Sequence, residues 1–272
     1  MSHAHDIPAI VVGFAAAVVA RVYVLGLSRL GVKGGTPPAW RSSAFLFGIA
    51  SIWAALGTPL VSCDADSLTG HMVQHLVLMT IAPALVLLGD PVRVLLSGLP
   101  RRVEHAIVRR FLWRASTRRS GTPLGVVSAC WLAASGTLIL WHVPAVFALA
   151  LRSPAWHAIE QASFLSTGLL FWWPVIEPWP GRPLPAWSIV VYLFMATLPC
   201  DVLSAFLVFS DRIAYGVYLS GAPESAGAIL ADQQRAGALM WTIVTIVYLV
   251  AGTLVSARLL MPRPEVRPSR VG

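Results

Sequence analysis

The sequence has few charged residues: Asp, Glu, Lys and Arg make up only 12% of its 272 residues, whereas hydrophobic residues make up 57%. Soluble domains carry about 25% charged residues, so this deficit excludes an ordinary water-soluble protein. Acidic residues are the scarcer kind, with 12 Asp and Glu against 20 Lys and Arg. Because charge is low along the whole chain, the composition predicts a protein that crosses a membrane several times.

Several motifs that would indicate other classes of protein are missing. The three cysteines, Cys63, Cys130 and Cys200, are odd in number and widely spaced, which argues against a disulfide framework. We expect Cys130 and Cys200 to be small packing residues. The sequence contains no Gly-rich phosphate loop, no nucleophile elbow, no repeat of fixed period and no basic leader of a cleaved signal peptide. No pattern of nucleophile and base indicates a hydrolase, and we expect a protein that is not an enzyme.

Seven segments are apolar over about 20 residues, the length that a helix needs to span a bilayer. Their apolar residues are continuous and do not alternate with polar ones, which favours helices over the strands of a barrel. We therefore predict an all-α transmembrane bundle of seven helices. The predicted spans are residues 7–27, 43–61, 68–88, 124–143, 156–176, 187–209 and 237–260.

The basic residues predict how this bundle is oriented. Sixteen of the 20 Lys and Arg fall in the connections after spans one, three and five and in the C-terminal tail, and three fall in the other connections. Since Lys and Arg are enriched on the cytoplasmic side, we expect the N-terminus outside and the C-terminus in the cytoplasm. In the most basic connection, Val103, Ile107 and Phe111 recur at helical spacing. They predict an amphipathic helix over 100–118, which binds anionic lipid headgroups or a partner protein, and not nucleic acid.

Two histidines lie at the start of the third span. His71 and His75 are four residues apart and share one face of a helix, which Met79 continues one turn deeper. Imidazole accepts copper, zinc, iron and nickel, and the thioethers of Met72 and Met79 favour Cu(I). The same pair would also fit a packed core in which hydrogen bonds satisfy both rings.

Further polar residues gather at the outer ends of the spans. His142 ends the fourth span, His157 begins the fifth, and Asp232 to Gln234 are expected to precede the seventh. Ionisable groups are costly inside a membrane and usually mark function, although His142 beside Trp141 also fits an interfacial aromatic belt. The predicted metal ligands are His71, His75, His142 and His157. Supporting or relay groups are Met72, Met79, Glu160 and Asp201, and candidate ligands from the outer connection are Cys63, Asp64 and Asp66.

Four blocks of the sequence resemble the CtaG family, the polytopic assembly factors of caa3-type cytochrome c oxidase. The blocks comprise residues 71–78, 141–152, 157–174 and 232–241, and the likeness extends over roughly residues 40 to 260. The resemblance implies a multi-pass protein of the bacterial inner membrane that matures a haem-copper oxidase. It further implies a part in supplying copper on the outer side, with oxidase subunits or a periplasmic copper carrier as partners.

Two other functions fit the same residues. A haem-binding electron carrier would use His75 with His142 or His157 as axial ligands. A proton- or ion-coupled transporter would use Glu160 and Asp201, although the polar residues do not continue to the inner side.

Overall fold

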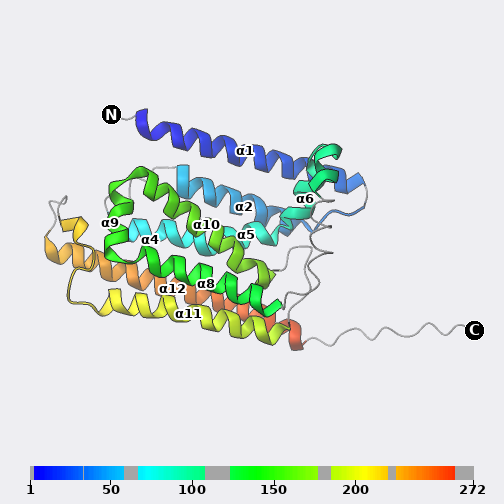
Figure 1. The fold of residues 1–272 in the computed structure, drawn as a ribbon. Helices are drawn as coiled ribbons and strands as arrows, with labels where there is room; N and C mark the ends of the chain where they lie inside the picture. The colour runs from blue at the N-terminus through cyan, green and yellow to red at the C-terminus, as the bar shows by residue number, and fades with distance from the viewer. Residues whose placement is uncertain are drawn as a thin grey trace, which may run out of the picture.

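The computed structural model describes residues 3–32, 34–57, 67–107, 123–176, 185–219 and 225–260, and over these residues its regular elements are all helices. The long helices lie alongside one another in a bundle (Figure 1). They are α1 (His3–Val32), α2 (Ala39–Gly57), α8 (Pro123–Trp141), α10 (Pro154–Ile176), α11 (Ala186–Phe209) and α12 (Ala226–Leu260). One more long segment is a continuous run of α4 (Leu68–Leu76), the π-helical η1 (Val77–Ile81) and α5 (Ala82–Leu88). Shorter elements are α6 (Pro91–Gly98), α9 (Pro144–Arg152) and η2 (Gly216–Leu219).

Six segments of the described chain are long and apolar enough to cross a membrane, and each overlaps a predicted span. They are Ala9–Val32, Ala39–Gly57, Leu68–Leu88, Leu124–Trp141, Trp187–Phe209 and Ala226–Ala257. Large apolar side chains such as Phe14, Phe194 and Leu249 are more than 60% exposed on the outside of the bundle. An apolar exterior of this extent suits lipid and not water, so the structure is that of a multi-pass membrane protein.

Two predicted elements are only partly represented in the structure. The predicted fifth span, 156–176, corresponds to α10, which is 23 residues long but is not among the six apolar segments. Its first turns carry His157, Glu160 and Gln161, which lower its hydropathy. Of the predicted surface helix 100–118, residues 101–107 are helical, Pro100 directly precedes them, and residues 108–118 lie outside the described residues.

The last helix begins earlier than expected. Helix α12 starts at Ala226 instead of 237, so Asp232 and Gln233 lie inside it and do not precede it. Both polar side chains are paired within the protein, which allows the helix to continue through them. Gln233 accepts a hydrogen bond from the amide of Ala214 (2.8 Å) and donates one to the carbonyl of Arg212 (3.2 Å).

The packing places one segment at the centre of the bundle. The main apolar core joins residues of α4, η1, α8, α10, α11 and α12, whereas a smaller cluster of Tyr23, Leu30, Phe45 and Val94 joins α1, α2 and α6. Figure 1 shows the start of α4, the start of α10, α9 and the start of α12 at one end of the bundle, with α6 at the other. We call the first of these the α9 end.

A proline explains the π-helical turn in the central segment. Pro83 has no N–H to bond the carbonyl of Met79, and its ring would clash with that carbonyl in a regular α-helix. The helix widens over Val77–Ile81, directly before this residue. A π-turn adds one residue to a helical turn. Side chains after it are therefore rotated away from the helix face that carries His71 and His75.

Candidate metal centre

Hydrogen bonds from Ser67 and Asp232 fix the start of α4. The Ser67 hydroxyl oxygen accepts a bond from the Gly70 amide at 3.1 Å, as helix N-caps do. The Asp232 carboxylate of α12 accepts one from the Leu68 amide at 2.7 Å and one from the Thr69 hydroxyl at 2.6 Å. The first amides of a helix have no partner within it, so these bonds stabilise the end of α4 and tie it to α12. They set the position of the histidines that follow.

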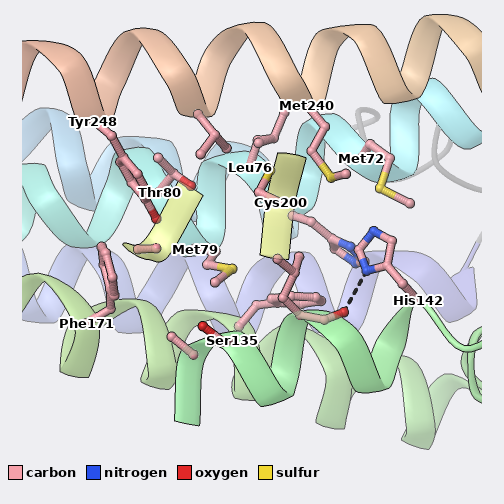
Figure 2. A pocket seen from close by; sticks show the side chains of 16 residues that line it. Met72, Leu76, Met79, Thr80, Ser135, His142, Phe171, Cys200, Met240 and Tyr248 are labelled. Carbon is pink, nitrogen blue, oxygen red and sulfur yellow. Dashed lines mark hydrogen bonds between the residues drawn. The ribbon is translucent and has the colours of Figure 1, made fainter. Parts of the chain in front are cut away.

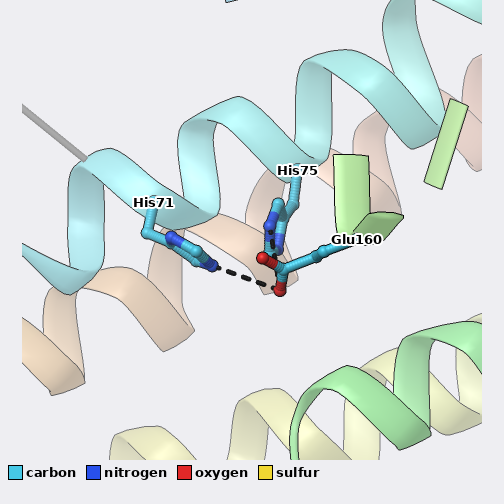
Figure 3. Close-up of side chains that lie close together, drawn as sticks. All are labelled: His71, His75 and Glu160. Atoms are coloured by element: carbon cyan, nitrogen blue, oxygen red, sulfur yellow. Dashed lines mark ion pairs between the residues drawn. The ribbon is translucent and has the colours of Figure 1, made fainter. Parts of the chain in front are cut away.

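His71 and His75 of α4 face the carboxylate of Glu160 on α10 (Figure 3). Oxygen Oε1 of Glu160 lies 3.5 Å from Nε2 of His71 and 3.4 Å from Nε2 of His75. His71 and Glu160 are 0% exposed and His75 is 5% exposed. One ligand atom from each of the three residues lies within 4.8 Å of the other two, and we call this group the His71–His75–Glu160 cluster.

The distances in the cluster fit a small metal ion. Charge-assisted hydrogen bonds between nitrogen and carboxylate oxygen are about 2.7–2.9 Å long, which is shorter than either contact to Glu160. Imidazole and carboxylate ligands lie about 2.0–2.2 Å from a tetrahedral ion, so such ligand atoms are about 3.3–3.5 Å apart. A carboxylate buried in a membrane protein also needs a compensating cation or proton. Two imidazoles and a carboxylate can together hold a transition-metal ion with one coordination position left open.

Aromatic rings enclose the cluster. The ring of Phe147, from α9, meets the His71 ring edge-on with 4.8 Å between centroids, and the Phe164 ring lies 4.2 Å from that of His75. Tyr215 packs against Phe147 at 4.2 Å and donates a hydrogen bond to the carbonyl of His142. These rings keep water away from the three polar groups.

His157 lies at the edge of the cluster. Its side chain is 22% exposed, its Nε2 is 4.0 Å from Oε2 of Glu160, and its ring stacks on that of His71 at 5.7 Å. The amide nitrogen of Gln161 lies 3.1 Å from Nε2 of His157 and donates a hydrogen bond to the side-chain oxygen of Gln74 at 3.2 Å. His157 is therefore the most exposed histidine next to the cluster.

His142 faces a cavity beside the cluster. Its Nδ1 is 2.7 Å from the carbonyl oxygen of Leu138, so Nδ1 carries the proton and Nε2 keeps its lone pair. Nε2 is buried and has no hydrogen-bond partner among the described residues. His142 lines a cavity of about 30 Å³ together with His75, Met72 and Met79 (Figure 2). With 6% exposure, His142 does not have the surroundings of an interfacial aromatic belt.

The remaining predicted residues are distributed differently. Met72 and Met79 line the cavity and are not part of the cluster. Asp201 is half-buried on α11 next to Cys200 and is also outside the cluster. The candidate ligands Cys63, Asp64 and Asp66 lie outside the described residues.

Glu160 and Asp232 have larger roles than sequence reasoning gave them. Glu160 was expected to support an imidazole, but it is a member of the cluster itself. Its spacing from His157 indicated the shared helix face, but only the packing of α10 against η1 and α5 brings it to His71. Asp232 carries no local signal for capping a helix that lies more than 160 residues away in the chain.

Comparison with known proteins gives a family but no solved relative. The chain is 27% identical over 238 residues to uncharacterised proteins of Mycobacterium bovis and Mycobacterium tuberculosis, and 26% identical over 263 residues to one of Mycobacterium leprae. These alignments cover 85% to 88% of this chain but only 36% to 38% of the relatives, so the chain spans little more than a third of their length. No solved structure matches. The model of the cytochrome c oxidase caa3 assembly factor family, Caa3_CtaG, matches residues 21–261, and the protein belongs to this family.

Proposed function

We propose that the protein binds copper at the His71–His75–Glu160 cluster and supplies it to a haem-copper oxidase during assembly. The observation that carries this proposal is the fully buried Glu160 carboxylate, which has two imidazole nitrogens 3.4–3.5 Å from one oxygen. A distance of this size is typical of two ligand atoms of one metal ion, and it is longer than a charge-assisted hydrogen bond between nitrogen and a carboxylate oxygen. Membership of the assembly-factor family supplies the recipient, an oxidase.

The proposed location is the bacterial plasma membrane, with seven spans and the cluster toward the outside. Helix α10 would be the seventh span because its 23 residues are long enough to cross the membrane and it packs within the same bundle. The start of α1 and the end of α12 lie at opposite ends of the bundle, which supports an odd number of crossings (Figure 1). Arg29 and Arg93 bond the backbone near α6, at the end opposite the cluster. The positive-inside rule then makes that end cytoplasmic.

The cluster suits delivery and not catalysis. A site that passes on its metal needs few ligands and an exchangeable position, because a saturated shell would retain the ion. Three buried ligands with the partly exposed His157 beside them meet this requirement. We therefore propose a copper carrier without catalytic turnover, which exchanges metal with a periplasmic carrier or an oxidase subunit.

The two alternative functions have less support. The cavity beside the histidines has about 30 Å³, whereas pockets for drug-sized ligands measure about 300–1,000 Å³, and a haem would need a space of that order. A transporter would need polar groups along the bundle, but Asp201 is separate from the cluster, and the residues lining the cavity beyond it are mostly apolar.

Copper loading of the purified full chain tests the proposal. We expect one Cu(II) per chain with nitrogen couplings in the electron paramagnetic resonance spectrum, because imidazole and carboxylate ligands suit this ion. Glu160→Gln and His71→Ala should each lose this signal, whereas His105→Ala should keep it because His105 is exposed on the 101–107 helix. Cells whose only copy carries Glu160→Gln should also lose oxidase activity. Equal copper in the wild type and Glu160→Gln would overturn the assignment.

A further inference from the structure

Sulfur-containing side chains surround the cavity next to the cluster. Met72 from α4, Met79 from η1, Cys200 from α11 and Met240 from α12 all line it. They are at most partly exposed, and Met72, Cys200 and Met240 are buried to 97% or more. Of the methionines that the structure describes, only Met195 points elsewhere, with 38% exposure on the outside of α11. The gathering of sulfur at this cavity is therefore selective.

One histidine of the cavity lining, His142, has a ring nitrogen without a hydrogen-bond partner among the described residues. This nitrogen, Nε2, keeps its lone pair and is fully buried. An unsatisfied buried polar group costs about 1–3 kcal/mol, so packing alone gives no reason to place it there. Figure 2 shows the His142 ring at the same end of the cavity as the thioethers of Met72 and Met240, with Met79 further along. A ligand in the cavity would satisfy this nitrogen.

The chemistry of these sulfur and nitrogen atoms favours one kind of metal ion. Thioethers and thiols are soft ligands that prefer Cu(I), and the lining otherwise consists mainly of apolar groups such as Phe164 and Leu138. A monovalent ion is less costly than a divalent one in such surroundings. About 30 Å³ admits an ion or a water molecule, and excludes an organic ligand.

We propose that this cavity is a second metal site, which binds Cu(I) through Nε2 of His142 and the sulfurs of Met72 and Met240. Met79 and Cys200 provide further sulfur deeper in the bundle, and His75 borders both this site and the cluster. The inference rests on the proposed function only in taking copper as the natural cargo. Binding involves no electron transfer, since Cu(I) enters and leaves by exchanging ligands.

Silver provides a direct probe because Ag(I) has the ligand preference of Cu(I) and does not change oxidation state under these conditions. The full chain is incubated with Ag(I), washed with a weak competitor and analysed for bound silver per chain. We expect the Met72→Leu, Met240→Leu double variant to bind silver at least tenfold more weakly than the wild type. Leu for Met keeps the volume and removes only the sulfur. Met195→Leu is the matched control and should bind like the wild type.

X-ray absorption of the wild type with Ag(I) keeps the test independent of whether the variants fold. Sulfur in the coordination shell of the bound ion supports the site, and a shell of nitrogen and oxygen only overturns it. Silver binding by the double variant at wild-type strength would also overturn it. Glu160→Gln separates the two proposals: it should lose Cu(II) at the cluster and retain Ag(I) in the cavity. If Glu160→Gln loses Cu(II) but the methionine double variant binds silver like the wild type, the proposed function is supported and the second site is refuted.

Discussion

Gln161 connects residues of three helices at the edge of the site. Its amide nitrogen lies 3.2 Å from the side-chain oxygen of Gln74 and 3.1 Å from Nε2 of His157, and Gln74 in turn donates to the carbonyl of Ala55 on α2. This row of hydrogen bonds holds the His157 ring against His71. Through these bonds, Gln161 acts on the cluster by way of His157.

Replacing Gln161 by Met should therefore weaken copper binding without abolishing it. Loss of a group that orients a metal ligand typically costs about 10–100-fold in affinity, and we expect about tenfold because His157 only borders the cluster. A competition titration of the purified variant with a Cu(II) chelator measures this. Ser166→Ala, on the exposed face of the same helix, should keep wild-type affinity. An unchanged affinity in Gln161→Met would mean that His157 takes no part in copper binding.

Residue types at the site were predictable, but their grouping was not. The i, i+4 spacing of His71 and His75 indicated a shared face, and the structure has both rings toward Glu160. His142 is not part of this group: its Nδ1 bonds the carbonyl of Leu138, and the residue lines the methionine-containing cavity. The spacing of residues along a helix determines only on which side of that helix their side chains lie. Which groups meet depends on how neighbouring helices are rotated, and a single sequence does not contain that information.

At the scale of elements, the approach of α10 to η1 decides whether Glu160 can reach the histidines. Gly168 makes this approach possible: a Cβ atom there would lie 2.5 Å from the carbonyl oxygen of Met79 and 2.9 Å from Cγ of Pro83. Real Cβ atoms do not come so close to backbone, so a larger residue must push the two helices apart.

Gly168→Ala should therefore lower both stability and copper affinity. Overpacking a helix contact costs about 1–3 kcal/mol, which corresponds to a loss of several degrees in the unfolding temperature in detergent. The displaced carboxylate should weaken Cu(II) binding in the same sample. Gly136→Ala on α8 is the control, since nothing lies within 4 Å of its added Cβ and Ala favours the helix. If both variants unfold at the wild-type temperature, the contact between α10 and η1 is looser than the structure indicates.

Element boundaries were predictable where composition alone decides them. The run Leu68–Leu88 matches the predicted span because Ser67 begins it and Gly89 follows it. The π-turn before Pro83 and the early start of α12 were not predictable in the same way. Helix α12 continues through Asp232 and Gln233 because these side chains find partners on α4 and on the 212–214 segment, and such pairing is visible only in the folded chain.

At the scale of the whole molecule, the two ends of the bundle differ in the groups that they carry. The starts of α4, α10 and α12 lie at the α9 end, with α6 at the other (Figure 1). The cluster residues come from α4 and the first turns of α10, whereas Arg93 belongs to α6 and Arg29 bonds the carbonyl of Ser97 in α6. Composition predicted a helical membrane bundle because apolar runs of this length have no other stable arrangement in lipid. Composition did not settle whether α10 crosses the membrane. The polar residues in its first turns lower its mean hydropathy, so α10 is not among the six apolar segments.

Labelling of single cysteines decides the orientation. In a Cys63→Ser background, Cys130 and Cys200 remain buried, so an introduced cysteine is the reactive one. Ser225→Cys, exposed at the start of α12, should react with a membrane-impermeant maleimide in intact cells, because copper would arrive on that side. His105→Cys on the exposed 101–107 helix should react only after the membrane is opened, since the basic end is expected in the cytoplasm. Labelling of both positions from the same side would require an even number of crossings between them. Helix α10 would then not span the membrane, and the seven-span arrangement would be refuted. Reaction of His105→Cys alone in intact cells would place the cluster on the cytoplasmic side and refute delivery of copper from outside.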